Sequence, residues 1–139
     1  MMKKLLFAID DTEVCERAAQ YILEMFGKDP DCTLTLIHAK PEFMLYGEAV
    51  LAAYDEIDLK AEEKARALVE KFSNFFTERG VNPYVLLKKG DPVEMVLQEA
   101  SNHNLLIIGA SESSFLNKLF TSHQDDFIEQ APIPLLIVK

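Results

Sequence analysis

The sequence is poor in several residue types that mark particular classes of protein. It has no tryptophan, five glycines and only two cysteines, Cys15 and Cys32, among 139 residues. Two cysteines are too few for a disulfide framework, and their spacing matches no metal-binding motif. The composition therefore excludes a disulfide-rich scaffold, and we expect a cytoplasmic, reducing environment.

Long hydrophobic runs and excess positive charge are also missing. No apolar run approaches the roughly 20 residues that a membrane-spanning helix needs. The first apolar segment stops at Asp10, which is too early for a secretory signal and is typical of a first strand. With 14 basic and 23 acidic residues the formal net charge is −9, so nucleic acid would be repelled at long range. We expect neither a nucleic-acid nor a membrane partner.

What remains is the composition of one globular domain spanning residues 1–139, with 49% hydrophobic and 27% charged residues. Short apolar segments alternate with stretches of helical periodicity. The predicted strands are residues 3–9, 33–39, 83–87, 105–108 and 135–138. Five strands separated by helices predict an α/β fold, with a mostly parallel sheet covered by helices on both faces.

Capping residues predict where the helices begin and end. Asp11 or Thr12 can cap the first helix, and Gly27 lies where it should stop. Asp91 before Pro92 predicts another helix start. A long amphipathic helix is predicted from residue 59 to near Gly80, and residues 42–58 are predicted to be partly helical at the rim of the sheet. The predicted inner face of the long helix comprises Ala61, Ala65, Leu68, Phe72 and Phe75.

The order of these segments resembles the universal stress protein family over nearly the whole chain. The resemblance rests on five short motifs: a first strand ending in Asp10, Leu36-Ile37-His38-Ala39, Gly90-Asp91-Pro92, Asn104-Leu-Leu-Ile-Ile-Gly109, and Ala131-Pro132-Ile133-Pro134 before the last strand. It implies a three-layer sandwich of the adenine nucleotide alpha hydrolase-like type, with strand order 3-2-1-4-5. Asp10 and Gly109 would then face each other across a crevice.

The resemblance also implies a ligand site. In nucleotide-binding members, the acid that ends strand one and a backbone group at the end of strand two hold the adenosine. A loop with the pattern G-x2-G-x9-G-[ST] wraps the phosphates. The nucleotide contacts implied for this chain are Asp10, Asp11, Thr12, Ala39, Gly109, Ala110, Ser111, Glu112, Thr121, Ser122 and His123.

Two of the three glycines in that pattern are missing. Gly109 matches the first, but Glu112 stands at the second. Counting forward from Gly109 places Ser122-His123 at the final pair, and counting back from Pro134 places Thr121-Ser122 there, so no glycine remains either way.

These replacements bear on ATP binding. A carboxylate about 5 Å from a phosphate oxygen would be repelled by roughly 3 kcal/mol at an effective dielectric of ~20. Each lost N–H contact to a charged phosphate removes a further ~1.5–3 kcal/mol. We therefore expect a stress-response binding module, not an enzyme, with weak or no ATP binding. The alternative is a member that binds ATP or AMP, with Mg²⁺, through the hydroxyl groups of its serine-rich loop.

Other chemistries are weaker alternatives. The segment from Gly109 to Ser113 lacks the second glycine of a serine-hydrolase nucleophile elbow. His123 with the acids at 125 and 126 is a weak metal candidate, because the first turns of helices collect acids for dipole reasons. We expect His38 to be packed or hydrogen-bonded rather than a base, and Cys15 to be a small hydrophobe rather than a redox residue.

Two partner surfaces are predicted. The implied strand order leaves Leu135–Val138 on a sheet edge, where unpaired backbone groups are a liability unless covered. Family members commonly dimerise through this strand, so the resemblance implies a homodimer. The apolar segment 43–54 is a further candidate, as a scaffold surface that docks a partner protein.

Overall fold

The computed structural model describes residues 2–40, 48–110 and 124–139, and for residues 48–58 and 124–126 it describes the backbone alone. Its elements, in chain order, are β1 (Lys3–Ala8), α1 (Glu13–Phe26), β2 (Cys32–Lys40), α2 (Glu48–Thr77), β3 (Tyr84–Lys89), α3 (Pro92–Ala100), β4 (Leu105–Gly109), α5 (Gln124–Gln130) and β5 (Leu135–Val138).

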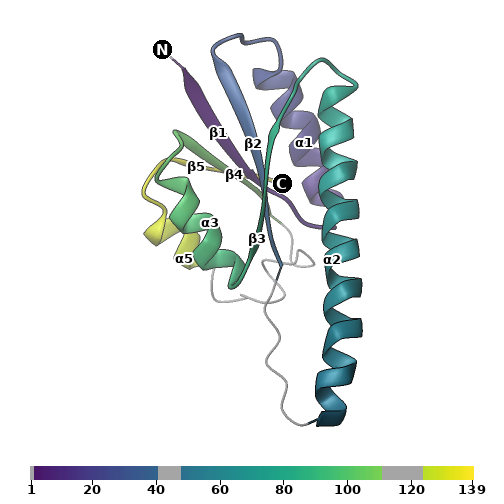
Figure 1. The fold of residues 1–139 in the computed structure, drawn as a ribbon. Coiled ribbons are helices and arrows are strands. Elements are labelled where there is room, and N and C mark those ends of the chain that lie inside the picture. The colour runs from purple at the N-terminus through teal and green to yellow at the C-terminus, as the bar shows by residue number, and fades with distance from the viewer. Residues whose placement is uncertain (1, 41–47, 111–123) are drawn as a thin grey trace.

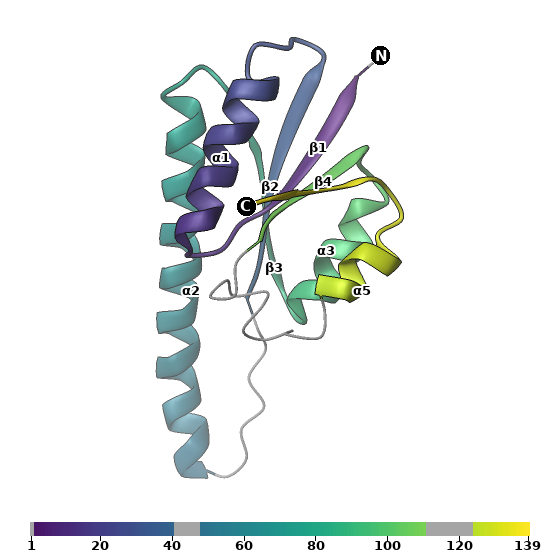
Figure 2. The ribbon, with the colours of Figure 1, turned by 180° about the vertical axis from the view of Figure 1, so that it is seen from behind.

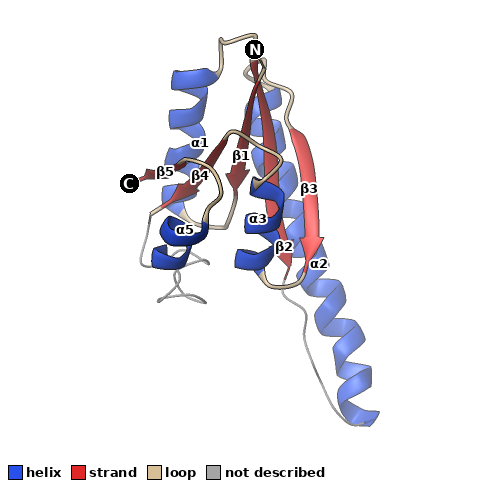
Figure 3. Ribbon diagram, turned by 90° about the vertical axis from the view of Figure 1, so that its left-hand side faces the viewer, coloured by secondary structure: helices blue, strands red, loops and turns tan. Residues whose placement is uncertain are grey.

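The five strands form one parallel sheet in the order β3-β2-β1-β4-β5. Helices α1 and α2 cover one face of this sheet, and α3 and α5 cover the other (Figure 1). Figure 3 shows the same three layers from the side. The predicted α/β architecture and strand order are confirmed.

Two hydrophobic clusters join these layers. Under α1 and α2, the ring of Phe7 meets Phe72 and Phe76 edge to face, with centroids 6.0 and 6.5 Å apart. Under α3 and α5, the second cluster contains Leu6 and the fully buried Phe127. Because successive residues of β1 point to opposite faces and both faces are covered, the buried residues 5–8 of the strand form a continuous apolar run.

Helix α2 is longer than the sequence predicts. It begins at Glu48, well before residue 59, and its amino-terminal part extends past the carboxyl ends of the strands (Figure 2). Residues 48–58 contain no glycine or proline and are rich in helix formers, so nothing interrupts the helix there. Residues 48–58 of the predicted partial helix over 42–58 are therefore the first part of α2. Residues 42–47 lie outside the described residues.

The end of α2 lies where Gly80 predicts it. After Thr77, Gly80 adopts a positive φ of 85°. The Val81 N–H bonds the Phe76 carbonyl at 2.9 Å and the Gly80 N–H bonds that of Thr77 at 3.2 Å, which is the Schellman arrangement. The inner face of this last turn uses Phe76, which is fully buried, whereas the predicted Phe75 is only half-buried.

The described helices contain no segment that is both long and apolar enough to cross a membrane.

Candidate functional site

The sheet order brings three strand ends together. In β1, Phe7 pairs with Leu36 of β2 and with Ile107 of β4, both in parallel register. Parallel strands end at the same edge of a sheet, so Asp10, Ala39 and Gly109 come together at the carboxyl edge. The strand order changes direction between β1 and β4, and we call this switch point, where open α/β sheets bind their ligands, the crevice.

Asp10 is buried beside this crevice and is oriented by the start of α1. Its side chain accepts a hydrogen bond from the Thr12 hydroxyl, and it is only 4% exposed. Thr12 is the N-cap of α1, because its oxygen accepts the Cys15 N–H at 3.2 Å. Since that oxygen is already accepting, the hydroxyl proton is directed to Asp10. Of the two predicted capping residues, Thr12 is the N-cap and Asp11 is exposed. Asp10 holds the Thr12 hydroxyl in position by accepting its hydrogen bond.

Cys15 lies behind Asp10 and is 1% exposed. Burial raises the pKa of its thiol well above the usual range, and the Asp10 carboxylate adds to the rise. The neutral sulfur accepts the Asp10 N–H at 3.3 Å. This environment suits the predicted small hydrophobe and keeps the sulfur in its unreactive thiol form.

His38 ties the end of β2 to the end of β1. Its Nδ1 lies 3.0 Å from the Ile9 carbonyl oxygen, and because a carbonyl only accepts, Nδ1 carries the proton. Burial lowers the pKa of His38, and the Ile9 carbonyl and Asp10 oppose that shift only in part. The ring is therefore neutral at pH 7, and the predicted hydrogen-bonded role of His38 is confirmed.

The backbone of Ala39 faces the crevice. Toward β1, the Ile37 carbonyl accepts the Ile9 N–H at 2.9 Å, and toward β3 the Lys40 carbonyl accepts the Gly90 N–H at 2.9 Å. Alternate residues of a strand direct their backbone groups to opposite neighbours, so Ala39 shares the direction of Ile37. The pairing of β1 stops at Ala8, so the N–H and C=O of Ala39 point past the end of that strand.

Gly109 packs tightly against α1. A Cβ at this position would lie 3.1 Å from Val14 Cγ1 and 3.3 Å from the Cys15 nitrogen, closer than side chains normally approach. Its φ lies outside the left-handed region, which only Gly80 and Gly90 occupy among the described residues. Glycine is therefore needed here because helix α1 comes close to β4.

Ala110 follows Gly109, and its N–H bonds the Val138 carbonyl at 2.7 Å, which fixes the direction in which the chain leaves the sheet. The remaining predicted contacts, Ser111, Glu112, Thr121, Ser122 and His123, lie outside the described residues, as does the candidate metal site at His123. Within the described ranges, no group of three or more His, Cys, Asp or Glu residues lies together to hold a metal ion.

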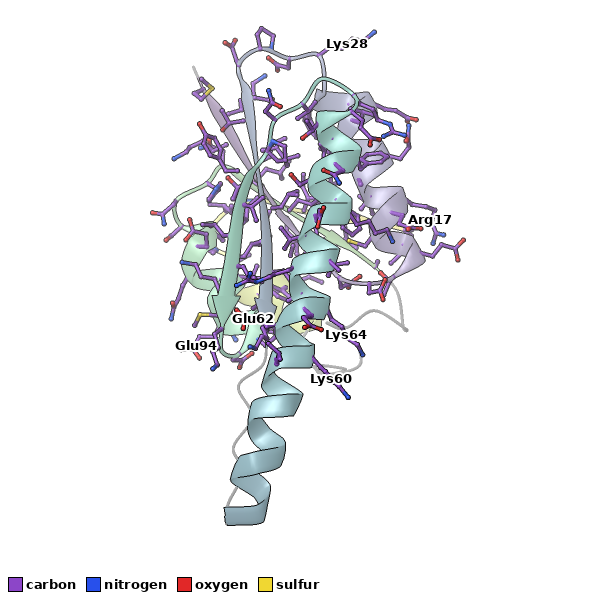
Figure 4. All side chains as sticks on the ribbon, turned by 45° about the vertical axis from the view of Figure 1, so that its right-hand side comes forward. Arg17, Lys28, Lys60, Glu62, Lys64 and Glu94 are labelled. Atoms are coloured by element: carbon purple, nitrogen blue, oxygen red, sulfur yellow. The ribbon has the colours of Figure 1, made fainter. Side chains whose placement is uncertain are left out.

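A hollow of about 300 Å³ lies at the opposite, amino end of the sheet, and the sequence did not predict it. Its walls come from the ends of α1 and α2 and the beginnings of β1, β2 and β3, and include Phe26, Cys32 and Phe76. Figure 4 shows Lys28, in the loop at this end, far from Glu94 at the start of α3. In the sequence, this hollow is marked only by the loop that follows the first helix, which runs from Gly27 to Pro30.

Asp29, which lines this hollow, is paired with groups around it. The Asp29 carboxylate accepts from the Asp31 N–H at 2.9 Å, from Lys3 Nζ at 3.0 Å and from Cys32 Sγ at 3.4 Å. The Asp31 N–H does most to hold the pKa of Asp29 below its usual value, followed by Lys3. These bonds close the loop between α1 and β2.

The strand order and the covering helices define a Rossmann-like α/β domain, a class of fold that binds its ligands at a switch point such as that between β1 and β4. Its sequence matches the universal stress protein family over residues 1–139. A universal stress protein of Helicobacter pylori is 36% identical over 135 residues, covering 97% of this chain and 98% of that protein. The chain belongs to the universal stress protein family.

Solved structures share the fold. The universal stress protein UspA from Lactobacillus plantarum superposes with a TM-score of 0.79 at 14% identity, covering 99% of this chain and 97% of that one. A family member from Arabidopsis thaliana, solved with AMP bound, has a TM-score of 0.71 at 20% identity, covering 99% of this chain and 91% of that one.

Proposed function

We propose that this universal stress protein is a cytoplasmic stress-response binding module, not an enzyme, that takes an adenine nucleoside monophosphate at its carboxyl-edge crevice. ATP binds weakly or not at all. Asp10 and the backbone of Ala39 support the choice of an adenosine ligand. The replaced glycines of the family pattern support weak binding of ATP.

Two groups of the crevice suit adenosine. The carboxylate of Asp10, oriented by Thr12, can accept hydrogen bonds from ribose hydroxyl groups. The Ala39 backbone offers a donor and an acceptor side by side, which suits the N1 and N6 edge of adenine. The AMP-bound Arabidopsis relative supports this choice of ligand, because its chain has the same fold.

The observation that carries the preference against ATP is the packing of Gly109. Its 3.1 Å approach to Val14 requires glycine whether or not a phosphate is present. The one glycine that this chain shares with the family pattern is thus explained by packing. The two positions whose only role would be to contact phosphates hold Glu112 and either Thr121 or Ser122. A loop without those glycines offers fewer bare N–H groups to a triphosphate.

Titration calorimetry with AMP and with Mg-ATP tests this function. We expect AMP to bind at least about tenfold more tightly than ATP, consistent with the loss of one or more phosphate contacts. Asp10→Ala should abolish AMP binding, while the matched control Asp29→Ala at the amino end should not. Equal affinities for AMP and ATP, or stoichiometric ATP in the purified protein, would favour the alternative in which the serine-rich loop binds the triphosphate.

The oligomeric state is a separate part of the proposal. Strand β5 forms one edge of the sheet, and Leu135, Leu136 and Ile137 on it are half-buried. A second copy paired along β5 would satisfy its open backbone groups, so we expect a homodimer. Light scattering at micromolar concentration should give twice the chain mass. Ile137→Lys should give the monomer mass, and the matched change Val85→Lys on the other edge strand should not.

A further inference from the structure

The carbonyl of Ile9 stands at the point where the ladder between β1 and β2 ends. In a parallel ladder, a residue donates its N–H to a carbonyl of the adjacent strand. Its own carbonyl then accepts from the N–H that lies two residues further along that strand. The last rung here joins the Ile9 N–H to the Ile37 carbonyl at 2.9 Å. The following rung would join the Ala39 N–H to the Ile9 carbonyl.

The structure replaces that rung with a side chain. Among the described residues, the Ile9 carbonyl accepts from His38 Nδ1 at 3.0 Å, and no backbone bond joins it to the Ala39 N–H. Strand β2 continues to Lys40 nevertheless, paired with β3 on its other side. Ala39 is therefore held in strand geometry by β3 while its β1 side is left open.

We infer that His38 is a positioning residue of the crevice: its ring occupies the Ile9 carbonyl and so keeps the Ala39 N–H available for a ligand. The inference rests on the proposed function for the ligand, an adenine ring whose N1 accepts from that N–H. His38 itself need not touch the nucleotide.

The ring is suited to this task in its neutral form. Donation to a carbonyl fixes the proton on Nδ1, and the lowered pKa of His38 keeps Nε2 unprotonated at pH 7. The charged group that acts on the ring is the buried Asp10 at the end of β1, which favours the protonated form but does not outweigh burial. The side chain thus holds the Ile9 carbonyl without placing a positive charge at the crevice.

Removing the ring should let the missing rung form. A ligand would then have to break one backbone hydrogen bond before binding, which corresponds to about a three- to tenfold loss of affinity. His38→Leu should weaken AMP binding by that factor in calorimetry. His38→Asn should rescue it to within about twofold, because the Asn amide can donate from nearly the position of Nδ1.

A matched control is present in the chain. His103 is 8% exposed and its Nδ1 lies 3.0 Å from the Glu99 carbonyl, so it makes the same kind of bond. It lies just before β4, at the amino end of the sheet. His103→Leu should leave AMP affinity unchanged. An equal loss in His103→Leu and His38→Leu, or no rescue by His38→Asn, would overturn the inference.

Hydrogen exchange tests the same inference without ligand. In the free wild-type protein the Ala39 amide should exchange much faster than that of Ile37, and in His38→Leu it should become protected because it gains a partner. If AMP fails to bind the wild type, the proposed function is wrong, but this exchange pattern still tests His38. An Ala39 amide equally protected in both proteins would make the positioning role wrong even where AMP binds.

Discussion

The two ends of the sheet each place an aspartate beside a helix terminus, and they use it differently. At the amino end, Asp29 is paired with Lys3 and with its own loop, next to a hollow of about 300 Å³. At the carboxyl end, Asp10 is nearly fully buried and accepts from the neutral hydroxyl of Thr12. The hollow at the amino end thus lies beside a charge that is already neutralised.

The difference teaches that the volume of a hollow is a weaker guide to a candidate ligand site in this fold than the direction in which polar groups point. In parallel α/β sheets the ligand edge is the carboxyl edge, where strand ends and helix starts direct backbone groups outward. At the amino end, Asp29 is paired with Lys3 and with its own loop. At the carboxyl end, Thr12 orients Asp10, and the Ala39 backbone points past the end of β1. Changes at the amino end should therefore cost stability alone, and only changes at the carboxyl end should also cost binding.

The largest effect on stability should come from Phe76, which is fully buried and lines the amino-end hollow. Phe76→Ala removes a ring packed against Phe7, and we expect the free energy of unfolding to fall by about 3–5 kcal/mol in urea titration. AMP affinity of the folded fraction should not change. Phe75→Ala is the control, because its half-exposed ring should cost clearly less. A change in AMP affinity with Phe76→Ala would break the division between the two ends.

The next effect concerns the loop that the family pattern assigns to the phosphates. Glu112→Gly removes a negative charge and restores the second glycine of the family pattern. A repulsion of about 3 kcal/mol corresponds to about a hundredfold in ATP affinity, which calorimetry would detect. Glu112→Gln should give part of this gain, since it removes the charge and keeps the bulk. ATP affinity unchanged in both variants would show that this carboxylate does not oppose the triphosphate.

A pair of glycines contrasts the two ends more finely. Gly109→Ala places a methyl group 3.1 Å from Val14, and overpacking of this kind costs about 1–3 kcal/mol. Gly80→Ala meets no atom within 4 Å, but a φ of 85° costs an alanine about 1 kcal/mol. Urea titration should give the larger loss for Gly109→Ala, and only that variant should weaken AMP binding. Equal stability losses would contradict the packing role of Gly109.

The sequence predicted those features that depend on local chemistry. The Thr12 cap, Gly80 at the end of α2 and the apolar strands follow from short-range rules, and the structure contains them. The strand order came from the family resemblance, because hydrophobic patterns do not record which strands are neighbours. The early start of α2 was missed, since residues 48–58 contain no glycine or proline that would mark a boundary.

The geometry of the candidate site was foreseen only where it follows from the topology. Asp10 and Gly109 were placed at one edge by the implied topology, but the packing of Gly109 against Val14 is a contact distant in sequence. The hydrogen bond from His38 to the Ile9 carbonyl also joins two strands, so no sequence motif predicts it. Contacts across elements are set by the assembled sheet, and only coordinates reveal them.

The smallest expected effect is a dependence of stability on pH that belongs to the carboxyl end. His38 has a folded-state pKa below its ordinary value of 6.5, chiefly because it is buried. The unfolded chain therefore binds more protons just below pH 6.5, so this contribution to stability is present above 6.5 and is lost as pH falls through the folded pKa. Urea titrations from pH 7.5 to pH 5 should show a steeper decline for wild type than for His38→Asn. Parallel curves would mean that the ring titrates alike in both states, and that burial does not hold it neutral.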